Sequence, residues 1–89
     1  MEIEFDSRKS QRNVELRGIS FDLAAGFDFD GALEVEDYRD GETRYFALGY
    51  IDKRLHALVY TLRSDVIRII SLRKANKREV RRYEQTTRP

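Results

Sequence analysis

The stretch VIRIISLRKANKREVRRY, residues 66–83, decides the fold that we expect for this chain. Its first part is apolar around Arg68 and predicts a buried strand that ends near Arg73. Its second part predicts a helix, because Asn76 is a favourable N-cap residue and Glu79, three positions later, completes a near-capping box. We therefore expect a strand that leads directly into a basic helix.

The predicted C-terminal helix concentrates positive charge. Lys77 and Arg81 are four positions apart, as are Arg78 and Arg82, and each like-charge pair at this spacing costs an isolated helix roughly 0.2–0.5 kcal/mol. Two such pairs indicate that an anion is normally nearby, either nucleic-acid phosphate or an acidic protein surface. A merely solvated helix face is the alternative interpretation.

Arg68 interrupts an apolar strand, where an unpaired charge is costly. Strict alternation places Arg68 and Arg73 on opposite faces of that strand. Arg68 then either lies on the open face of the sheet or pairs with a carboxylate of the acidic strand upstream. A planar guanidinium is also the group that bidentate phosphate recognition requires.

The N-terminal region predicts two helices. Asp6 is a suitable N-cap for a helix that runs to about residue 16, and Gly18 stands where a left-handed glycine would end it. Ser20 is a second N-cap, for a helix over about residues 21–27. The short connection between the two helices predicts an αα-hairpin.

The rest of the chain predicts strands joined by tight turns. Residues 1–5 alternate and form a short strand or a strand-like lead-in, and longer strands are expected at 33–38, 44–51, 55–62 and 66–73. Tight links between consecutive strands imply an antiparallel meander. We therefore predict an α+β fold with two N-terminal helices, a four-stranded antiparallel sheet, to which residues 1–5 would add a short strand, and a C-terminal helix.

The size and composition of the chain indicate one globular domain, residues 1–89. The chain has 89 residues, enough for a single modest core, and its 37% of charged residues predicts a heavily charged surface. No apolar run approaches the roughly 18 residues of a membrane span, and the N-terminus lacks the apolar core of a signal peptide. We expect a cytoplasmic protein without membrane contact.

The net charge of +1 conceals a strong asymmetry. Residues 28–42 contain seven acidic residues and only Arg39 as a base, whereas residues 63–89 contain nine basic residues and three acidic ones. This asymmetry predicts a basic face that attracts polyanions and an acidic face that attracts basic partners. Alternatively, the two segments neutralise each other across one sheet, and the sequence leaves both interpretations open.

Few residue types for catalysis are present apart from arginine, lysine and carboxylates. The chain has no cysteine and a single histidine, His56, which excludes a thiolate zinc site and a histidine pair. We interpret His56 as a structural strand residue, with a general-base role as the alternative. The sequence shows neither a glycine-rich phosphate loop nor a cluster at metal-ligand spacing, so we expect no metal and no cofactor.

Six short segments follow one another in an order and spacing that are specific for so short a chain. They are EFD (4–6), GISF (18–21), ALEVED (32–37), RYFALG (44–49), VYTLR (59–63) and RIISLRKANKRE (68–79). Lys9, Asn13 and Tyr83 fit the same pattern. Together these residues resemble the BrnT family of bacterial type II toxins, which are ribonucleases with a RelE-like fold, over about residues 3–84.

One departure from the family pattern bears on catalysis. The family usually has Lys-His before the glycine of the helical hairpin, whereas this chain has Leu16 and Arg17 before Gly18. If that histidine aids catalysis, its role in this chain must pass to another residue or be weaker.

The resemblance implies a metal-independent RNA endonuclease that cleaves mRNA. It also implies neutralisation by a BrnA-like antitoxin whose ribbon-helix-helix domain carries the complex to operator DNA. RNA cleavage needs a base near the 2′-OH, cations around the pentavalent phosphate and an acid near the 5′-oxygen. By resemblance, the candidate catalytic residues are Arg68, Arg73, Glu79 and Tyr83, and the candidate RNA-binding residues are Arg44, Lys77, Arg78 and Arg81.

The roles expected at these positions differ. Arg44, Arg68 and Arg73 would bind or stabilise phosphate, while the basic helix residues would steer RNA. Glu79 would act as a base or orient an arginine, although the near-capping box explains it without chemistry. Tyr83 would stack on a base or donate a proton.

Two other functions stay open at the level of sequence. One is a non-catalytic module that binds nucleic acid or a partner protein, and the other is a toxin relic weakened by Arg17. For the antitoxin we expect the basic face, since acidic residues of a partner could occupy the phosphate positions there.

Overall fold

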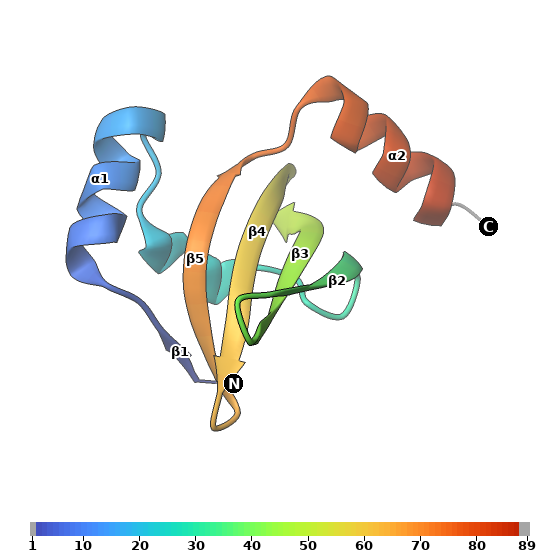
Figure 1. Ribbon diagram of the computed structural model, residues 1–89. Helices are drawn as coiled ribbons and strands as arrows, with labels where there is room; N and C mark the ends of the chain where they lie inside the picture. The colour runs from blue at the N-terminus through green and yellow to red at the C-terminus, as the bar shows by residue number, and fades with distance from the viewer. Residues whose placement is uncertain (1, 88–89) are drawn as a thin grey trace.

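The computed structural model describes residues 2–87 as a five-stranded sheet with three helical segments (Figure 1). The elements are β1 (Ile3–Glu4), α1 (Ser7–Arg17), the 3-10 helix η1 (Phe21–Gly26), β2 (Leu33–Arg39), β3 (Glu42–Ile51), β4 (Arg54–Arg63), β5 (Val66–Lys74) and α2 (Lys77–Thr87). The strand order is β1-β5-β4-β3-β2. β1 runs parallel to β5, and the other neighbouring strands are antiparallel.

The prediction of two N-terminal α-helices and a four-stranded antiparallel sheet is wrong. The segment after Ser20 forms a 3-10 helix, and its buried residues Phe21, Ala24 and Phe27 recur every three positions, which matches the three-residue turn of that helix. The lead-in is a true strand, since Ile3 pairs with Ile67 of β5 and makes the sheet mixed. One α-helix therefore precedes the four consecutive strands β2–β5, and one follows them.

The predicted ends of α1 are confirmed. The Asp6 carboxylate accepts hydrogen bonds from the backbone N–H groups of Lys9 and Arg8, which lower the pKa of Asp6. Gly18 adopts a left-handed φ of 71° and donates its N–H to the Val14 carbonyl. Local cap chemistry thus fixes α1 at both ends.

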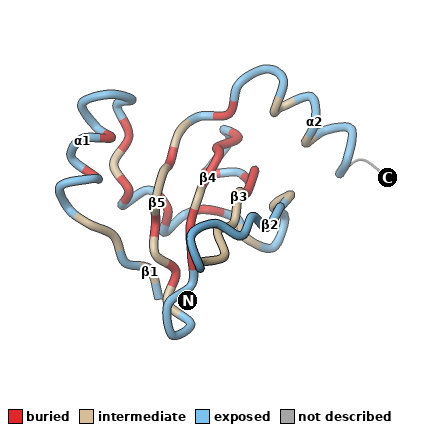
Figure 2. Tube along the Cα trace, in the orientation of Figure 1, coloured by how far each residue is buried: buried red, intermediate tan, exposed pale blue. Residues whose placement is uncertain are grey.

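The two faces of the sheet carry separate apolar cores. Leu58 and Leu72 face the core that includes Phe21 and Ala24 of η1, whereas Ala57 packs in a smaller core with Val80 of α2. Figure 2 shows the buried positions along β4 and β5, with both helices largely exposed. We call the second side of the sheet the α2 face.

A β-bulge in β5 decides which residues share the α2 face. Val59 pairs with Ser71 whereas Tyr60 pairs with Ile69, so Ile70 is the extra residue. Beyond the bulge the alternation of faces is shifted by one position. Arg68, Ser71 and Arg73 therefore all lie on the α2 face. The prediction that Arg68 and Arg73 lie on opposite faces is wrong.

The strand order separates the acidic and basic segments of the chain. The acidic strand β2 is an edge strand, and β4 and β3 lie between it and β5. Among residues 2–87, Arg63–Glu42, at 3.6 Å, is the one ion pair that joins residues 28–42 to residues 63–87. The two segments therefore do not neutralise each other across the sheet. Within the same part of the chain, no helix is long and apolar enough to cross a membrane.

Candidate functional site

Three rows of cross-strand neighbours line the α2 face. The rows, from β5 to β2, are Arg68–Thr61–Arg44–Asp37, Ser71–Val59–Phe46–Val35 and Arg73–Ala57–Leu48–Leu33. α2 packs on the third row, where Val80 and Tyr83 contact the core around Leu48 and Ala57. The first two rows lie beyond α2, and this part of the α2 face is the candidate site.

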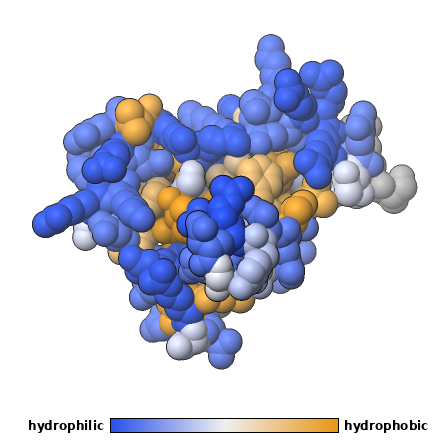
Figure 3. Space-filling model, in the orientation of Figure 1, coloured by the Kyte–Doolittle hydropathy of each residue, from blue (hydrophilic) through white to orange (hydrophobic). Residues whose placement is uncertain are grey.

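A pocket of about 320 Å³, which we call the sheet pocket, opens on the first two rows. Its lining residues are Asp37, Arg39, Arg44, Tyr45, Phe46, Val59, Ile70 and Ser71. The space-filling view shows apolar side chains at the surface in the middle of the molecule, between α1 and α2 (Figure 3). An apolar floor bordered by guanidinium and hydroxyl groups suits a flat ring that carries a phosphate.

Arg44 carries an unused donor in this pocket. Its Nε is buried and has no hydrogen-bond partner within the described part of the chain. Leaving a buried donor unpaired costs on the order of 1–3 kcal/mol. Arg44 also lines the sheet pocket, so its guanidinium is placed to meet an anion bound there, which supports the expectation that this residue binds phosphate.

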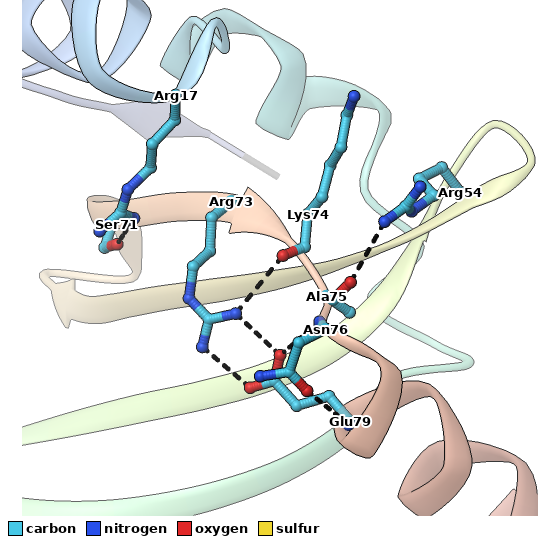
Figure 4. Close-up of polar contacts among 8 residues, drawn as sticks. All are labelled: Arg17, Arg54, Ser71, Arg73, Lys74, Ala75, Asn76 and Glu79. Carbon is cyan, nitrogen blue, oxygen red and sulfur yellow. Dashed lines mark hydrogen bonds and ion pairs between the residues drawn. The ribbon is translucent and has the colours of Figure 1, made fainter.

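Arg17 is a residue of the site that sequence reasoning missed. It is the last residue of α1, and its Nη1 donates a hydrogen bond to the Ser71 hydroxyl at 3.1 Å (Figure 4). Arg17, the residue that departs from the family pattern, therefore places a positive charge beside Ser71 in the row Ser71–Val59–Phe46–Val35. Ser71 gave no signal in the sequence, since the bulge that exposes it on this face depends on pairing with β4.

A second pocket adjoins the sheet pocket and continues the basic surface onto α1. The two pockets share Ile70 and Ser71, and the second is also lined by Lys9, Arg12, Asn13, Leu16, Arg17 and Phe21. Lys9 and Arg12 are three positions apart, which places them on one side of the helix. That spacing is the signal in the sequence that could have included α1 in the site.

Arg73 and Glu79 form a bidentate ion pair at the junction of β5 and α2 (Figure 4). Nη1 donates to Oε1 at 2.7 Å and Nη2 donates to Oε2 at 2.8 Å. The Glu79 carboxylate also accepts the Asn76 N–H, and the Asn76 side chain accepts the Glu79 N–H, so the predicted capping box is confirmed. One carboxylate thus caps the helix and fixes a guanidinium.

The ion pair changes the acid–base character of both groups. The hydrogen bond from Arg73 is the main cause that lowers the pKa of Glu79, and the same bond raises the pKa of Arg73. A carboxylate with a lowered pKa is a weak base at neutral pH. Glu79 is therefore better suited to orient Arg73 than to remove a proton.

Arg68 also has a carboxylate partner, although not one from the acidic strand. Its Nη1 lies 3.3 Å from Oε1 of Glu4, which is its neighbour on β1. Both side chains are partly exposed, and ion pairs of this kind contribute little to stability. An incoming phosphate can compete for Arg68 at low cost.

Tyr83 and the basic residues of α2 lie apart from the sheet pocket. The Tyr83 hydroxyl donates to the Gly31 carbonyl at 2.8 Å, its ring packs edge-to-face on Tyr50, and burial raises its pKa. Lys77 and Arg81 border a different pocket, near Arg54 at the start of α2. These candidates are therefore not brought together with Arg44 and Arg68, and Arg78 is fully on the exposed side of the helix.

His56, the remaining candidate for a general base, is a structural residue away from the site. His56 is 5% exposed, and its ring Nδ1 is hydrogen-bonded to the Arg54 carbonyl oxygen at 2.8 Å. Its neighbour in β5 is Lys74, so it lies on the face opposite to Arg73. Among residues 2–87, no three His, Cys, Asp or Glu side chains are grouped so that they could hold a metal ion.

Comparison with known families identifies the class of protein. Residues 5–79 match a family model described as a ribonuclease toxin of a type II toxin–antitoxin system. The family is BrnT, and the chain belongs to it, which confirms the resemblance found in the sequence. Comparison with curated proteins gave no match, and comparison with solved structures gave none either. Membership of this family implies an antitoxin as partner.

Proposed function

We propose that the chain is a metal-independent endoribonuclease that cleaves mRNA, and that the first two rows of the α2 face bind the RNA. The observation that carries this proposal is the bulge at Ile70, which places Arg68, Ser71 and Arg73 on the same face as Arg44. Arg44 lines the sheet pocket, Arg68 lies on the same row as Arg44, and Arg17 is hydrogen-bonded to Ser71 of the middle row. Arg73 lies on the adjoining third row. A RelE-like fold is part of the same proposal.

RNA binding is assigned first to the sheet pocket. Arg44 lines the pocket and offers its guanidinium to a phosphate, and Ser71 lies on the neighbouring row. Phe46 and Val59 supply an apolar floor on which a base can stack, a contact worth about 1–3 kcal/mol per base. Lys77, Arg78 and Arg81 lie outside the pocket and would steer RNA toward it by long-range attraction.

Phosphoryl transfer is assigned to the arginines. In the proposed reaction the 2′-oxygen passes its proton to a water molecule and forms a bond to phosphorus, while the bond from phosphorus to the 5′-oxygen breaks and that oxygen takes up a proton from water. Negative charge grows on the phosphate oxygens, and fixed cations stabilise it. Glu79 holds Arg73 in place before the substrate arrives. The Arg73 guanidinium therefore needs little reorganisation when negative charge grows on the phosphate.

Tyr83, which lies outside the sheet pocket, is the alternative to water as proton donor to the 5′-oxygen. Its hydroxyl is protonated at neutral pH, as a proton donor requires, because burial raises a pKa whose ordinary value is already 10.0. The hydroxyl is engaged with Gly31, at the end of the sheet where β2 begins. It would have to leave that carbonyl before it could donate to a 5′-oxygen.

The proposed partner is a BrnA-like antitoxin with a ribbon-helix-helix domain. The complex would bind operator DNA through the antitoxin, and both proteins would act in the cytoplasm. The antitoxin would hold the ribonuclease inactive until it is removed.

An RNA cleavage assay in EDTA tests the proposal. Purified wild-type protein is incubated with mRNA transcripts and with the same sequence carrying 2′-deoxy sugars. We expect cleavage of RNA, no cleavage of the deoxy substrate, and no loss of rate in EDTA. Absence of cleavage, or cleavage that EDTA abolishes, would contradict the proposal.

A second function, binding of RNA without cleavage, is favoured by two observations. Arg68 and Arg73 are each already paired with a carboxylate, and Arg17 stands where the family usually has histidine. This function predicts RNA binding that weakens steeply with salt while the RNA stays intact. The cleavage assay described above distinguishes the two functions, because the RNA is shortened by the nuclease and stays intact if it is only bound.

A further inference from the structure

We infer that the outer edge of β2 is the docking site for a basic, extended segment of the antitoxin, which joins the sheet as a sixth strand. The inference rests on the proposed function, since it takes the partner to be the antitoxin that restrains the ribonuclease. It assigns the antitoxin to the acidic edge rather than to the basic face expected from charge alone.

The outer edge of β2 is open. Leu33–Arg39 pairs with β3 on one side and is the last strand of the sheet. Within residues 2–87, no backbone hydrogen bond outside the sheet involves this segment, and every residue from 34 to 39 is exposed. An edge strand of seven residues, whose alternate N–H and C=O groups point away from β3, is a template for an added strand. The opposite edge, β1, has only two residues.

The charge of this edge selects the partner. Glu34 and Glu36 face Ala47 and Tyr45 on β3, so neither has a basic cross-strand neighbour. Asp37 is the exception, because it lies beside Arg44 and pairs with Arg39 at 3.1 Å. Uncompensated carboxylates repel RNA phosphate and also repel the identical edge of a second copy of this chain. A segment rich in lysine or arginine is the complementary partner.

A pocket on the side of the sheet that carries Glu34 adds a second contact. Its largely apolar lining consists of Phe29, Tyr60, Leu62 and Ile67, and its carboxylates are Glu34 and Asp65. Glu34 accepts a hydrogen bond from the Tyr60 hydroxyl through Oε1. Leu62 is 46% exposed, which is unusual for a leucine on a strand that is otherwise largely buried. Apolar walls with carboxylates fit a long basic side chain, whose methylene stem packs while its charge meets a carboxylate.

Docking at β2 would also explain neutralisation. Asp37 and Arg39 of β2 belong to the lining of the sheet pocket. An added strand would lie about 4.8 Å beyond β2, so its side chains on the α2 face would stand beside Val35 and Asp37. They would narrow the entry to Arg44 without displacing α2.

Hydrogen exchange of the wild-type complex tests the inference. The toxin is mixed with its cognate antitoxin, and amide exchange is followed by mass spectrometry. We expect those amides of residues 33–39 that point away from β3 to become protected by roughly tenfold or more, as for newly paired strand amides. Protection confined to residues 66–83, with residues 33–39 unchanged, would overturn the inference.

Two charge-reversal variants test the inference by antitoxin binding, independently of hydrogen exchange. Glu36→Lys alters the exposed edge, whereas Glu15→Lys makes the same charge change on the exposed side of α1. We expect Glu36→Lys to weaken antitoxin binding by about tenfold and to leave RNA cleavage unchanged, with Glu15→Lys close to wild type in binding. Equal binding by both variants, or a free toxin that dimerises through β2, would count against the inference. If the wild-type protein does not cleave RNA, the proposed function is contradicted. Protection of residues 33–39 by the antitoxin would still support docking at β2.

Discussion

Arg73 at the end of β5 and Glu79 in the first turn of α2 are joined by two parallel hydrogen bonds of 2.7 and 2.8 Å. The pair ties the C-terminal helix to the sheet and holds a guanidinium on the α2 face. The same carboxylate caps α2, so capping and the placement of a candidate catalytic arginine depend on one side chain.

Replacing Glu79 with Gln should separate a positioning role from a base role. Glutamine keeps an oxygen for the Asn76 N–H but loses the ionic bond to Arg73, so the free energy of unfolding should fall by about 1–2 kcal/mol. If Glu79 only positions Arg73, the cleavage rate should fall by roughly tenfold. A loss of about 10³-fold or more in a folded variant would identify Glu79 as the base. Urea unfolding measures the change in the free energy of unfolding, and single-turnover cleavage measures the change in rate.

The stability of the protein should depend on the ionisation of Glu79 at acidic pH. Its pKa in the folded state is lowered from an ordinary value of 4.5, chiefly by the hydrogen bond from Arg73. The stabilisation is therefore complete above pH 4.5 and is lost as the pH falls through the lowered pKa. Thermal melts from pH 7 to pH 2.5 should show a steeper loss for wild type than for Glu79→Gln. Parallel curves for the two proteins would show that the ion pair does not stabilise the fold.

Replacing Arg44 with Met should weaken RNA binding without destabilising the fold. Methionine retains an apolar stem of similar length but removes the buried Nε that has no partner in the described structure. We expect weaker binding of single-stranded RNA and a salt dependence reduced by about 0.7 in the log–log slope, the value for one phosphate contact. Arg8→Met, on the exposed side of α1, is the matched control. An unchanged slope for Arg44→Met would remove Arg44 from the RNA site.

Arg17 should contribute to cleavage through the middle row. Arg17→Ala removes the hydrogen bond to Ser71 and a cation, and the rate should fall by about tenfold. Arg17→His places a group with an ordinary pKa near 6.5 at this position, so the rate should acquire a dependence on pH between about 5.5 and 7.5 that wild type lacks. Rates of both variants equal to wild type at every pH would show that Arg17 lies outside the working site.

Features set by neighbouring residues could be predicted from the sequence. The caps at Asp6, Gly18 and Asn76 depend on side chains within a few positions, and all three were found as expected. The second helix failed as a prediction because its apolar residues suit a three-residue turn as well as an α-helical face. The β1–β5 pair could not be seen, since it joins residues more than sixty positions apart.

The candidate site was harder to predict than the caps. Arg44, Arg68 and Arg73 were named from the sequence, but their common face depends on the bulge at Ile70, which only the pairing of β5 with β4 produces. Arg17 was read as a departure from the family pattern rather than as a neighbour of Ser71. Such contacts between distant segments leave no periodic signal in the chain.

The most direct test of the central claim compares Arg73→Ala with Lys74→Ala in the EDTA cleavage assay. The two residues are adjacent in β5, but Arg73 lies on the α2 face and Lys74 on the opposite one. The account predicts that Arg73→Ala, once shown to be folded by circular dichroism, cleaves RNA about 10²-fold or more slowly than wild type, while Lys74→Ala cleaves at the wild-type rate. Equal rates for the two variants would contradict the claim that the arginine-lined α2 face performs the reaction.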